Sequence, residues 1–223
     1  MTNKNFKTAR VDRYPVAAYY RLLLADLILD KNRLIYLDGD TMVLKDLSEM
    51  INLKMNNNLI LGFADNSYKK AEVFGIKTYK YITSGVLLIN LKKMRKEKIT
   101  QKFFDFIEIN NKKLTQEDQT VINIMLHGRI DLLPPKFGVW NFFNQKSLFK
   151  HNIYRKKNLN IKIYDEDVLL KAWKFPSILH FVRSKPWKKK RKYKNKVFHE
   201  KWWEYAKLSD EYNNIINFYS GRK

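Results

Sequence analysis

Residues 33–47 read RLIYLDGDTMVLKDL, and this stretch decides how we expect the chain to fold. Residues 34–38 begin with an apolar run rich in β-forming side chains, which predicts a short buried strand. The strand ends in Asp38, Gly39 and Asp40, after which a second apolar run begins. Ligands of open α/β sheets bind at the carboxyl ends of the strands, so the pattern predicts a binding site at this turn.

Asp38 and Asp40 put two carboxylates one residue apart at the end of a buried strand. Desolvating and crowding two anions is unfavourable unless something neutralises them. A divalent cation would do so, because oxygen ligands suit magnesium or manganese, and these ions keep positions free for water and substrate phosphate. Gly39 would let a ligand approach the backbone closely. The alternative is an ordinary turn, in which Asp and Gly are common.

The composition describes a folded and strongly basic protein. Its 223 residues suit one domain with a sizeable core, and 45% of them are hydrophobic, which excludes a disordered polycation. The net charge of +22 predicts attraction to nucleic acid, an anionic membrane surface or a phosphorylated substrate. The absence of cysteine excludes disulfides and thiolate metal sites.

Helical and strand patterns alternate along the chain, which is typical of an α/β fold. We expect helices at residues 16–29, 48–58, 92–110, 115–127 and 197–208. We expect strands at residues 34–38, 59–64, 86–91, 130–133 and 173–181, and irregular structure over residues 136–170. Pro15 would start the first helix, and Thr115 would cap the fourth, with Asp118 at its third position.

Arg21 lies in the first expected helix, which is apolar almost all round. Such a helix is buried against a sheet, so its arginine needs a partner. Asp26, a carboxylate of the Asp38-Gly39-Asp40 turn or a ligand anion could supply that partner, and the sequence leaves the three alternatives open.

Five blocks of the chain together resemble glycosyltransferase family 8 in their order and spacing. They are YYRLLLADLI (19–28), IYLDGDTMVLKDL (35–47), SGVLLINLKKM (84–94), EDQTVIN (117–123) and HFVRSKPW (180–187). The resemblance implies a GT-A fold, that is, a Rossmann-like mixed sheet flanked by helices, as in nucleotide-diphospho-sugar transferases. It also implies a retaining enzyme that moves glucose or galactose from a UDP-sugar to a glycan or lipid-linked acceptor, in the synthesis of cell-surface polysaccharide.

The resemblance assigns a metal site. Asp38 and Asp40 match the family's D-x-D, which holds manganese (or magnesium) against the donor's diphosphate, and His180 matches the third protein ligand. Lys185 matches a lysine that holds the diphosphate, where a positive charge would stabilise the leaving group. Without the resemblance, His180 would be a packed strand histidine and Lys185 one more lysine in a Lys-rich chain.

The resemblance also assigns residues that contact the donor. Arg21 matches an arginine beneath the nucleotide, with structural support of Asp38 as a compatible alternative. Asp65 and Asp118 match aspartates that bind the sugar, and Gln119 matches a residue near the anomeric carbon. The structural alternatives are a strand-end turn for Asp65 and a helix cap for Asp118.

Two positions depart from the family pattern. Thr83 precedes Ser84 in the donor-binding block, where the family usually has asparagine. Arg183 stands where the family has a glycine that lets the backbone approach the phosphate. Both departures favour an altered donor preference or lost activity.

The family's N-terminal strands, which hold the nucleoside, would precede residue 15, so we expect an N-terminally incomplete sheet. This incompleteness would reflect truncation, a contribution from another chain or a degenerate paralogue.

The C-terminal segment 188–223 is expected to form a basic, aromatic helical tail after a catalytic domain at residues 1–187. Seven of the nine residues in 188–196 are Lys or Arg, and Trp202 and Trp203 follow. We expect this tail to contact an anionic membrane peripherally, or to be a solvated charge run.

The start lacks a signal peptide, so a cytoplasmic chain held at the inner membrane face is expected. The rival hypothesis is an inactive member acting as a polyanion- or membrane-binding module, although no nucleic-acid-binding motif is visible.

Overall fold

The computed structural model describes residues 16–110, 113–114, 117–156, 159–183, 185–188 and 195–220. The chain divides into two compact units, which are described separately. Unit 1 comprises Met1–Leu37, Leu47–Pro134 and Ile153–Ile163, and unit 2 comprises Asp38–Asp46, Pro135–Asn152 and Tyr164–Lys223. The division runs through the residue 33–47 stretch, since Leu37 belongs to unit 1 and Asp38 to unit 2.

Unit 1 is built on a four-stranded mixed sheet of order β1-β4-β3-β5, as expected for the GT-A fold. The strands are β1 (Leu34–Leu37), β4 (Ile82–Ile89), β3 (Ile60–Ala64) and β5 (Ile130–Leu132). Strand β4 runs antiparallel to both β1 and β3, whereas β3 and β5 are parallel. Every residue of β3 and β4 is buried, but β1 is half-buried. The predicted strand before Asp38 is therefore present, but it is half-buried rather than buried, since β1 lies at the edge of the described sheet.

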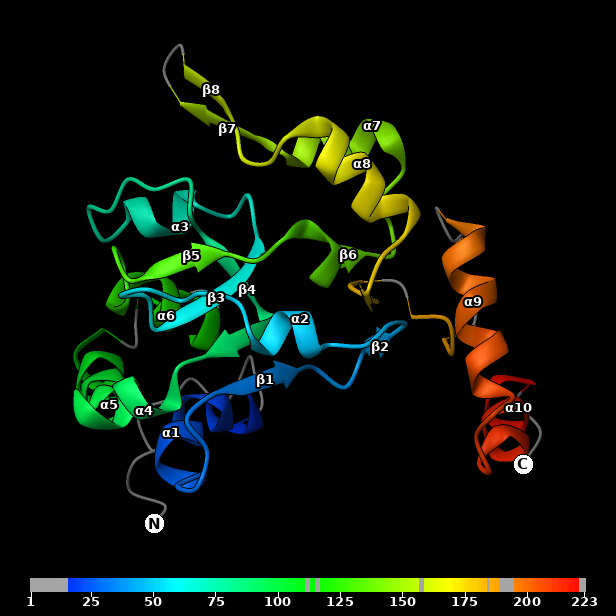
Figure 1. Ribbon diagram of the computed structural model, residues 1–223, viewed down its shortest axis with the longest axis horizontal. Helices are drawn as coiled ribbons and strands as arrows, with labels where there is room; N and C mark the ends of the chain where they lie inside the picture. The colour runs from blue at the N-terminus through cyan, green and yellow to red at the C-terminus, as the bar shows by residue number, and fades with distance from the viewer. Residues whose placement is uncertain are drawn as a thin grey trace. The chain divides into compact units, whose positions relative to one another are not determined.

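The helices of unit 1 cover this sheet and bury its apolar side chains (Figure 1). They are η2 (Val16–Leu23), α1 (Leu24–Leu27), α2 (Ser48–Ile51), α3 (Lys69–Glu72), α4 (Leu91–Lys96), α5 (Ile99–Asn110) and α6 (Glu117–Met125). The first expected helix is mostly a 3-10 helix, and it is less buried than predicted, since Tyr20 is 53% exposed and Leu27 56% exposed. The expected helix 92–110 is two helices, separated near Lys98, which has a φ of 52°. Pro15 and Thr115 lie outside the described residues.

Unit 2 contains a three-stranded sheet of order β2-β9-β6. Strand β2 (Thr41–Val43) pairs antiparallel with β9 (Ile178–His180), which pairs parallel with β6 (Val139–Trp140). Around it lie η3 (Pro135–Phe137), α7 (Gln145–His151), α8 (Glu166–Lys174), α9 (Lys196–Ala206) and α10 (Tyr212–Ser220). The prediction that residues 136–170 are irregular was wrong, since they contain these elements and the hairpin of β7 (Ile153–Lys156) and β8 (Leu159–Lys162) in unit 1.

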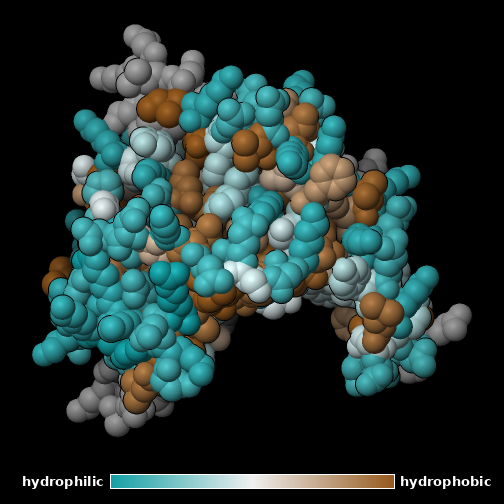
Figure 2. Space-filling model, in the orientation of Figure 1, coloured by the Kyte–Doolittle hydropathy of each residue, from teal (hydrophilic) through white to brown (hydrophobic). Residues whose placement is uncertain are grey.

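Polar side chains cover most of the visible surface, with apolar side chains showing around α9 and α10 (Figure 2). Helix α10 lies in the expected helical tail, beyond the helix predicted at residues 197–208, and its Phe218 is 74% exposed. Within the described part of the chain, no helix has the length and hydrophobicity needed to cross a membrane.

Candidate active site

The three predicted metal ligands come together in unit 2. Asp38, Asp40 and His180 each offer a ligand atom, and these atoms lie within 4.8 Å of one another. The pairing of β2 with β9 brings them together, because it places Thr41 opposite His180 and so sets the Asp38-Gly39-Asp40 turn beside the end of β9. We call Asp38, Asp40 and His180 the candidate metal cluster.

The donor atoms of this cluster fit a divalent cation. His180 Nε2 lies 3.0 Å from Asp40 Oδ1 and 4.0 Å from Asp38 Oδ2. Two carboxylates and one imidazole form the oxygen and nitrogen donor set that suits manganese. The Nδ1 atom of His180 is buried, and no described residue forms a hydrogen bond with it, whereas Nε2 faces the two carboxylates.

Electrostatics keep Asp40 ionised, as a metal ligand must be. Burial raises the pKa of Asp40, but hydrogen bonds and positive charge from His180 and Lys185 lower it more, to about 2. Lys185 Nζ forms an ion pair with Asp40 Oδ2, and it also donates to the carbonyl oxygen of Phe181 at 2.5 Å. Phe181 N donates in turn to the carbonyl oxygen of Asp40 at 2.8 Å. The structure therefore places Lys185 beside the predicted metal ligands.

Two backbone positions near the cluster affect how closely a ligand could approach it. Gly39 is not among the glycines with positive φ, and a Cβ at this position would meet no atom within 4 Å. The turn therefore does not require glycine for its conformation, and the residue instead leaves open space. Arg183 has a φ of 67°, in the left-handed region that favours glycine, and its guanidinium lies 5.1 Å from the ring centre of Phe142.

The other predicted polar residues meet in unit 1, at the end of β3 and the start of α6. Gln119 Nε2 donates to Asp65 Oδ2 at 2.9 Å, and Ser84 N donates to Gln119 Oε1 at 3.3 Å. All three residues are buried. We call Asp65, Ser84 and Gln119 the unit 1 network. Asp65 Oδ1 also accepts from Ser67 N at 2.8 Å, so the turn expected as a structural alternative is present.

Arg21 finds its partner in Asp118, which was none of the three alternatives that we predicted. Arg21 Nε lies 3.1 Å from Asp118 Oδ2, and both side chains are nearly buried. Arg21 also donates to the carbonyl oxygen of Ser84 at 2.6 Å and lies over the ring of Tyr36. Thr83 is buried, and its Oγ1 accepts from Gly85 N at 3.4 Å.

Sequence analysis missed two buried residues behind the unit 1 network. Asn123 accepts from Ile82 N at 2.7 Å and donates to Ile82 O at 2.8 Å, which ties α6 to β4. Its place one turn after Gln119 in the EDQTVIN block was a signal for this role. The hydroxyl of Tyr81 lies 3.5 Å from Thr120 Oγ1, and burial raises the pKa of Tyr81 to about 12.

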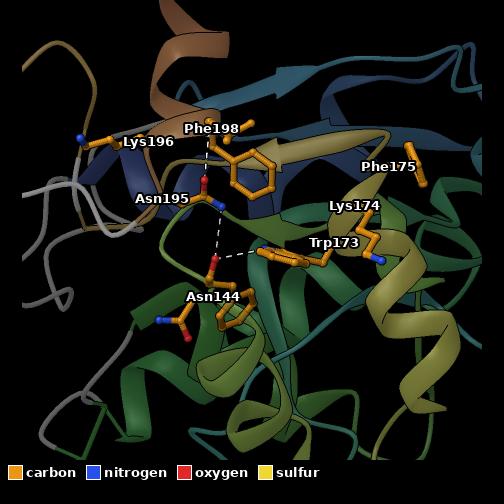
Figure 3. A pocket seen from close by; sticks show the side chains of 9 residues that line it. Asn144, Trp173, Lys174, Phe175, Asn195, Lys196 and Phe198 are labelled. Atoms are coloured by element: carbon orange, nitrogen blue, oxygen red, sulfur yellow. Dashed lines mark hydrogen bonds between the residues drawn. The ribbon is translucent and has the colours of Figure 1, made fainter.

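A hollow of about 430 Å³ in unit 2 contains none of the predicted site residues (Figure 3). Trp173 Nε1 and Asn195 Nδ2 both donate to the carbonyl oxygen of Phe143, at 3.1 and 3.3 Å, and fix the wall of this hollow.

Most of the basic run that follows Trp187 lies outside the described residues, so its predicted membrane contact stays a prediction.

Solved structures with the same arrangement of elements are GT-A glycosyltransferases. A galactosyltransferase LgtC, solved with donor and acceptor sugar analogues, matches with a TM-score of 0.72 and 18% identity over 96% of this chain and 77% of its own. The glycosyltransferase GlyE of Streptococcus pneumoniae TIGR4 matches with a TM-score of 0.59 and 26% identity over 88% of this chain and 44% of its own. The fold is therefore the expected GT-A fold.

Sequence comparison defines the family. The model of glycosyl transferase family 8 matches residues 2–191, so the chain belongs to this family. General stress protein A of Bacillus subtilis is 28% identical over 90% of this chain and 69% of its own length. A lipopolysaccharide 1,2-glucosyltransferase of Escherichia coli is 32% identical over 56% of this chain, which corresponds to only 39% of that protein.

Proposed function

We propose that the chain is a metal-assisted retaining glycosyltransferase that moves glucose or galactose from a UDP-sugar to a glycan or lipid-linked acceptor. The observation that carries the proposal is the convergence of Asp38, Asp40 and His180 beside Lys185, in a chain of this family. A cluster of two carboxylates and one imidazole suits manganese or magnesium, and a lysine beside it suits an anionic ligand. The name of the E. coli relative supports glucose as a donor sugar.

Each residue has a proposed role. Asp38, Asp40 and His180 would hold the divalent cation, which would supply positive charge to the donor's diphosphate. Lys185 would add its charge as the diphosphate departs. In the unit 1 network, Asp65 and Gln119 would contact the donor sugar, together with Asp118. Ser84 and Thr83 would line the donor side, and Arg21 would support them from beneath.

The chemistry follows from charge development. The bond between the anomeric carbon and the diphosphate oxygen breaks, and the anomeric centre gains oxocarbenium character. The acceptor hydroxyl oxygen bonds to the anomeric carbon on the face that the diphosphate leaves, which retains configuration, and the hydroxyl proton leaves with the diphosphate. Lys185 favours this step because negative charge develops on the departing diphosphate. The positive charge of Lys185 therefore stabilises the transition state more strongly than it stabilises the bound donor.

Calorimetry of UDP binding with and without manganese tests the proposal. We expect wild-type protein to bind UDP in a manganese-dependent manner, and Asp40→Ala or His180→Ala to weaken manganese binding by at least about tenfold. Asp26→Ala and His127→Ala are matched controls, because both side chains are exposed. Unchanged manganese affinity in both Asp40→Ala and His180→Ala would refute the proposal that these residues bind the metal.

The same titrations separate the proposal from a polyanion-binding module, which the net charge of +22 favours. A module would bind nucleic acid or anionic vesicles with steep salt dependence and would be indifferent to manganese and UDP. Vesicle binding that accompanies manganese-dependent UDP binding would instead support the membrane contact predicted for residues 188–196.

A further inference from the structure

A second hollow of unit 2 adjoins the candidate metal cluster. Its volume is about 410 Å³, within the range of ligand-binding pockets. The residues that line it are Gly39, Trp187, Trp202, Asn214, Ile215 and Phe218. Gly39 separates Asp38 from Asp40, so the hollow opens beside the turn to which the proposed function assigns the donor's diphosphate.

Aromatic rings form one wall of this hollow and are held in place by their neighbours. The rings of Trp187 and Trp202 lie 5.2 Å apart with an angle of 37° between them, and Trp203 packs edge-on against Trp202 at 4.9 Å. Trp203 Nε1 donates to His199 Nε2 at 3.3 Å, and burial lowers the pKa of His199, which favours the neutral acceptor. Tyr219 of α10 closes the series at 4.9 Å from Trp203. The wall is therefore preorganised before any ligand binds.

The other sides of this hollow offer open space at Gly39 and exposed apolar surface at Phe218. A Cβ on Gly39 would meet nothing within 4 Å, and the φ of Gly39 lies outside the left-handed region, so neither packing nor backbone conformation requires a glycine there. Phe218 keeps 74% of its surface exposed to solvent at the rim. Exposed aromatic surface of this kind gains free energy when a ligand covers it.

We propose that this hollow binds a sugar ring of the acceptor, stacked against Trp187 and Trp202 and covered at the rim by Phe218. The inference rests on the proposed function and specifies its acceptor as a saccharide. A pyranose presents a face of C–H bonds that packs on an indole ring, while its hydroxyl groups lie at the ring edge. The open mouth of the hollow and the amide of Asn214 leave those hydroxyl groups in contact with water and polar atoms.

Saccharide binding by the full chain tests the proposal, with methyl β-glucoside, methyl β-galactoside and lactose as probes in saturation-transfer NMR titrations. We expect at least one probe to bind the wild-type protein. Its affinity should fall about threefold to tenfold in Phe218→Ser and in Trp187→Leu, because each loses one aromatic contact. Leu208→Ser is the matched control, since Leu208 is 81% exposed and does not line the hollow.

The outcomes separate this inference from the proposed function when manganese-dependent UDP binding is measured on the same samples. Wild-type protein that binds UDP but none of the three probes would overturn the inference, as would equal probe affinity in wild type and Phe218→Ser. Probe binding that depends on Phe218, in a chain without UDP binding, would support the saccharide site and refute the proposed function. Phe218 is largely exposed, so its substitution tests the inference even if Trp187→Leu disturbs folding.

Discussion

The ion pair of Arg21 and Asp118 allows a quantitative test of how unit 1 is held together. Arg21 comes from η2 and Asp118 from α6, so the pair joins two elements that are far apart in the sequence. Their side chains are only 10% and 13% exposed. Asp118→Asn keeps the shape of the side chain but removes the negative charge that lies beside the buried guanidinium of Arg21.

Removing one charge of a buried pair costs about 3–5 kcal/mol, because the other charge stays desolvated. In Asp118→Asn, Arg21 keeps the carbonyl oxygens of Ser84 and Ala18 and the face of Tyr36, so we expect the lower end, about 3 kcal/mol. Arg21→Met loses all of these contacts, so its cost should be higher, about 4 kcal/mol. The double variant should be destabilised by less than the sum of the single variants, by at least about 1 kcal/mol.

Urea unfolding followed by circular dichroism measures these free energies. Glu204→Gln is the control, because it breaks the Lys201–Glu204 pair, whose side chains are 44% and 61% exposed. Exposed pairs contribute little, so the control should change stability by less than about 0.5 kcal/mol. If Asp118→Asn is no less stable than the control, or if the effects of Arg21→Met and Asp118→Asn add, the pair does not hold η2 to α6.

Three further predictions concern backbone space, backbone conformation and pH. Gly62→Ala should lower the free energy of unfolding by about 1–3 kcal/mol, measured in urea, because the new Cβ would lie 2.7 Å from Ile82 Cδ1 and 2.9 Å from Ile82 Cβ. Gly39→Ala is the control, since its Cβ would meet no atom within 4 Å and the free energy of unfolding should not change. Arg183→Gly should be about 1 kcal/mol more stable than Arg183→Ala, since only glycine adopts a φ of 67° without strain; equal stability would contradict this. Burial raises the pKa of Tyr81 to about 12, so the unfolded chain ionises first and the free energy of unfolding should fall by about 2 kcal/mol as pH rises from 10 to 12. Tyr81→Phe should flatten this part of the stability profile.

The strands of the four-stranded sheet in unit 1 could be predicted because local signals define them. Residues 60–64 form an uninterrupted apolar run that can only be a buried strand or helix, and Asp65 ends it. The cluster needs more than local signals, since Asp40 and His180 are distant in the sequence. Only the resemblance to the family joined them, and the β2–β9 pairing supplies the physical reason.

Other features could not be predicted because tertiary contacts decide them. The sequence around Arg21 offered Asp26, yet Asp26 is exposed and the partner lies in a helix nearly a hundred residues later. The break at Lys98 lies in an otherwise continuous amphipathic pattern. By contrast, helix α7 did carry a signal that we missed. Asn144 accepts from Ser147 N, and Ser147 Oγ accepts from Asn144 N, which is a capping box with serine in place of glutamate.

The two groups of predicted site residues differ in how a ligand would have to bind them. In the unit 1 network, Asp65 already accepts hydrogen bonds with both carboxylate oxygens, and Gln119 uses both its donor and its acceptor atom. A sugar hydroxyl that binds there must replace existing hydrogen bonds, so its net gain in free energy is small. In the candidate metal cluster, Asp38 and Asp40 lie with the imidazole of His180, the ammonium of Lys185 pairs with Asp40, and a bound divalent cation would add positive charge for the diphosphate. Most of the free energy of donor binding should therefore come from the diphosphate and the cation, so UDP should bind far more tightly than free glucose or galactose.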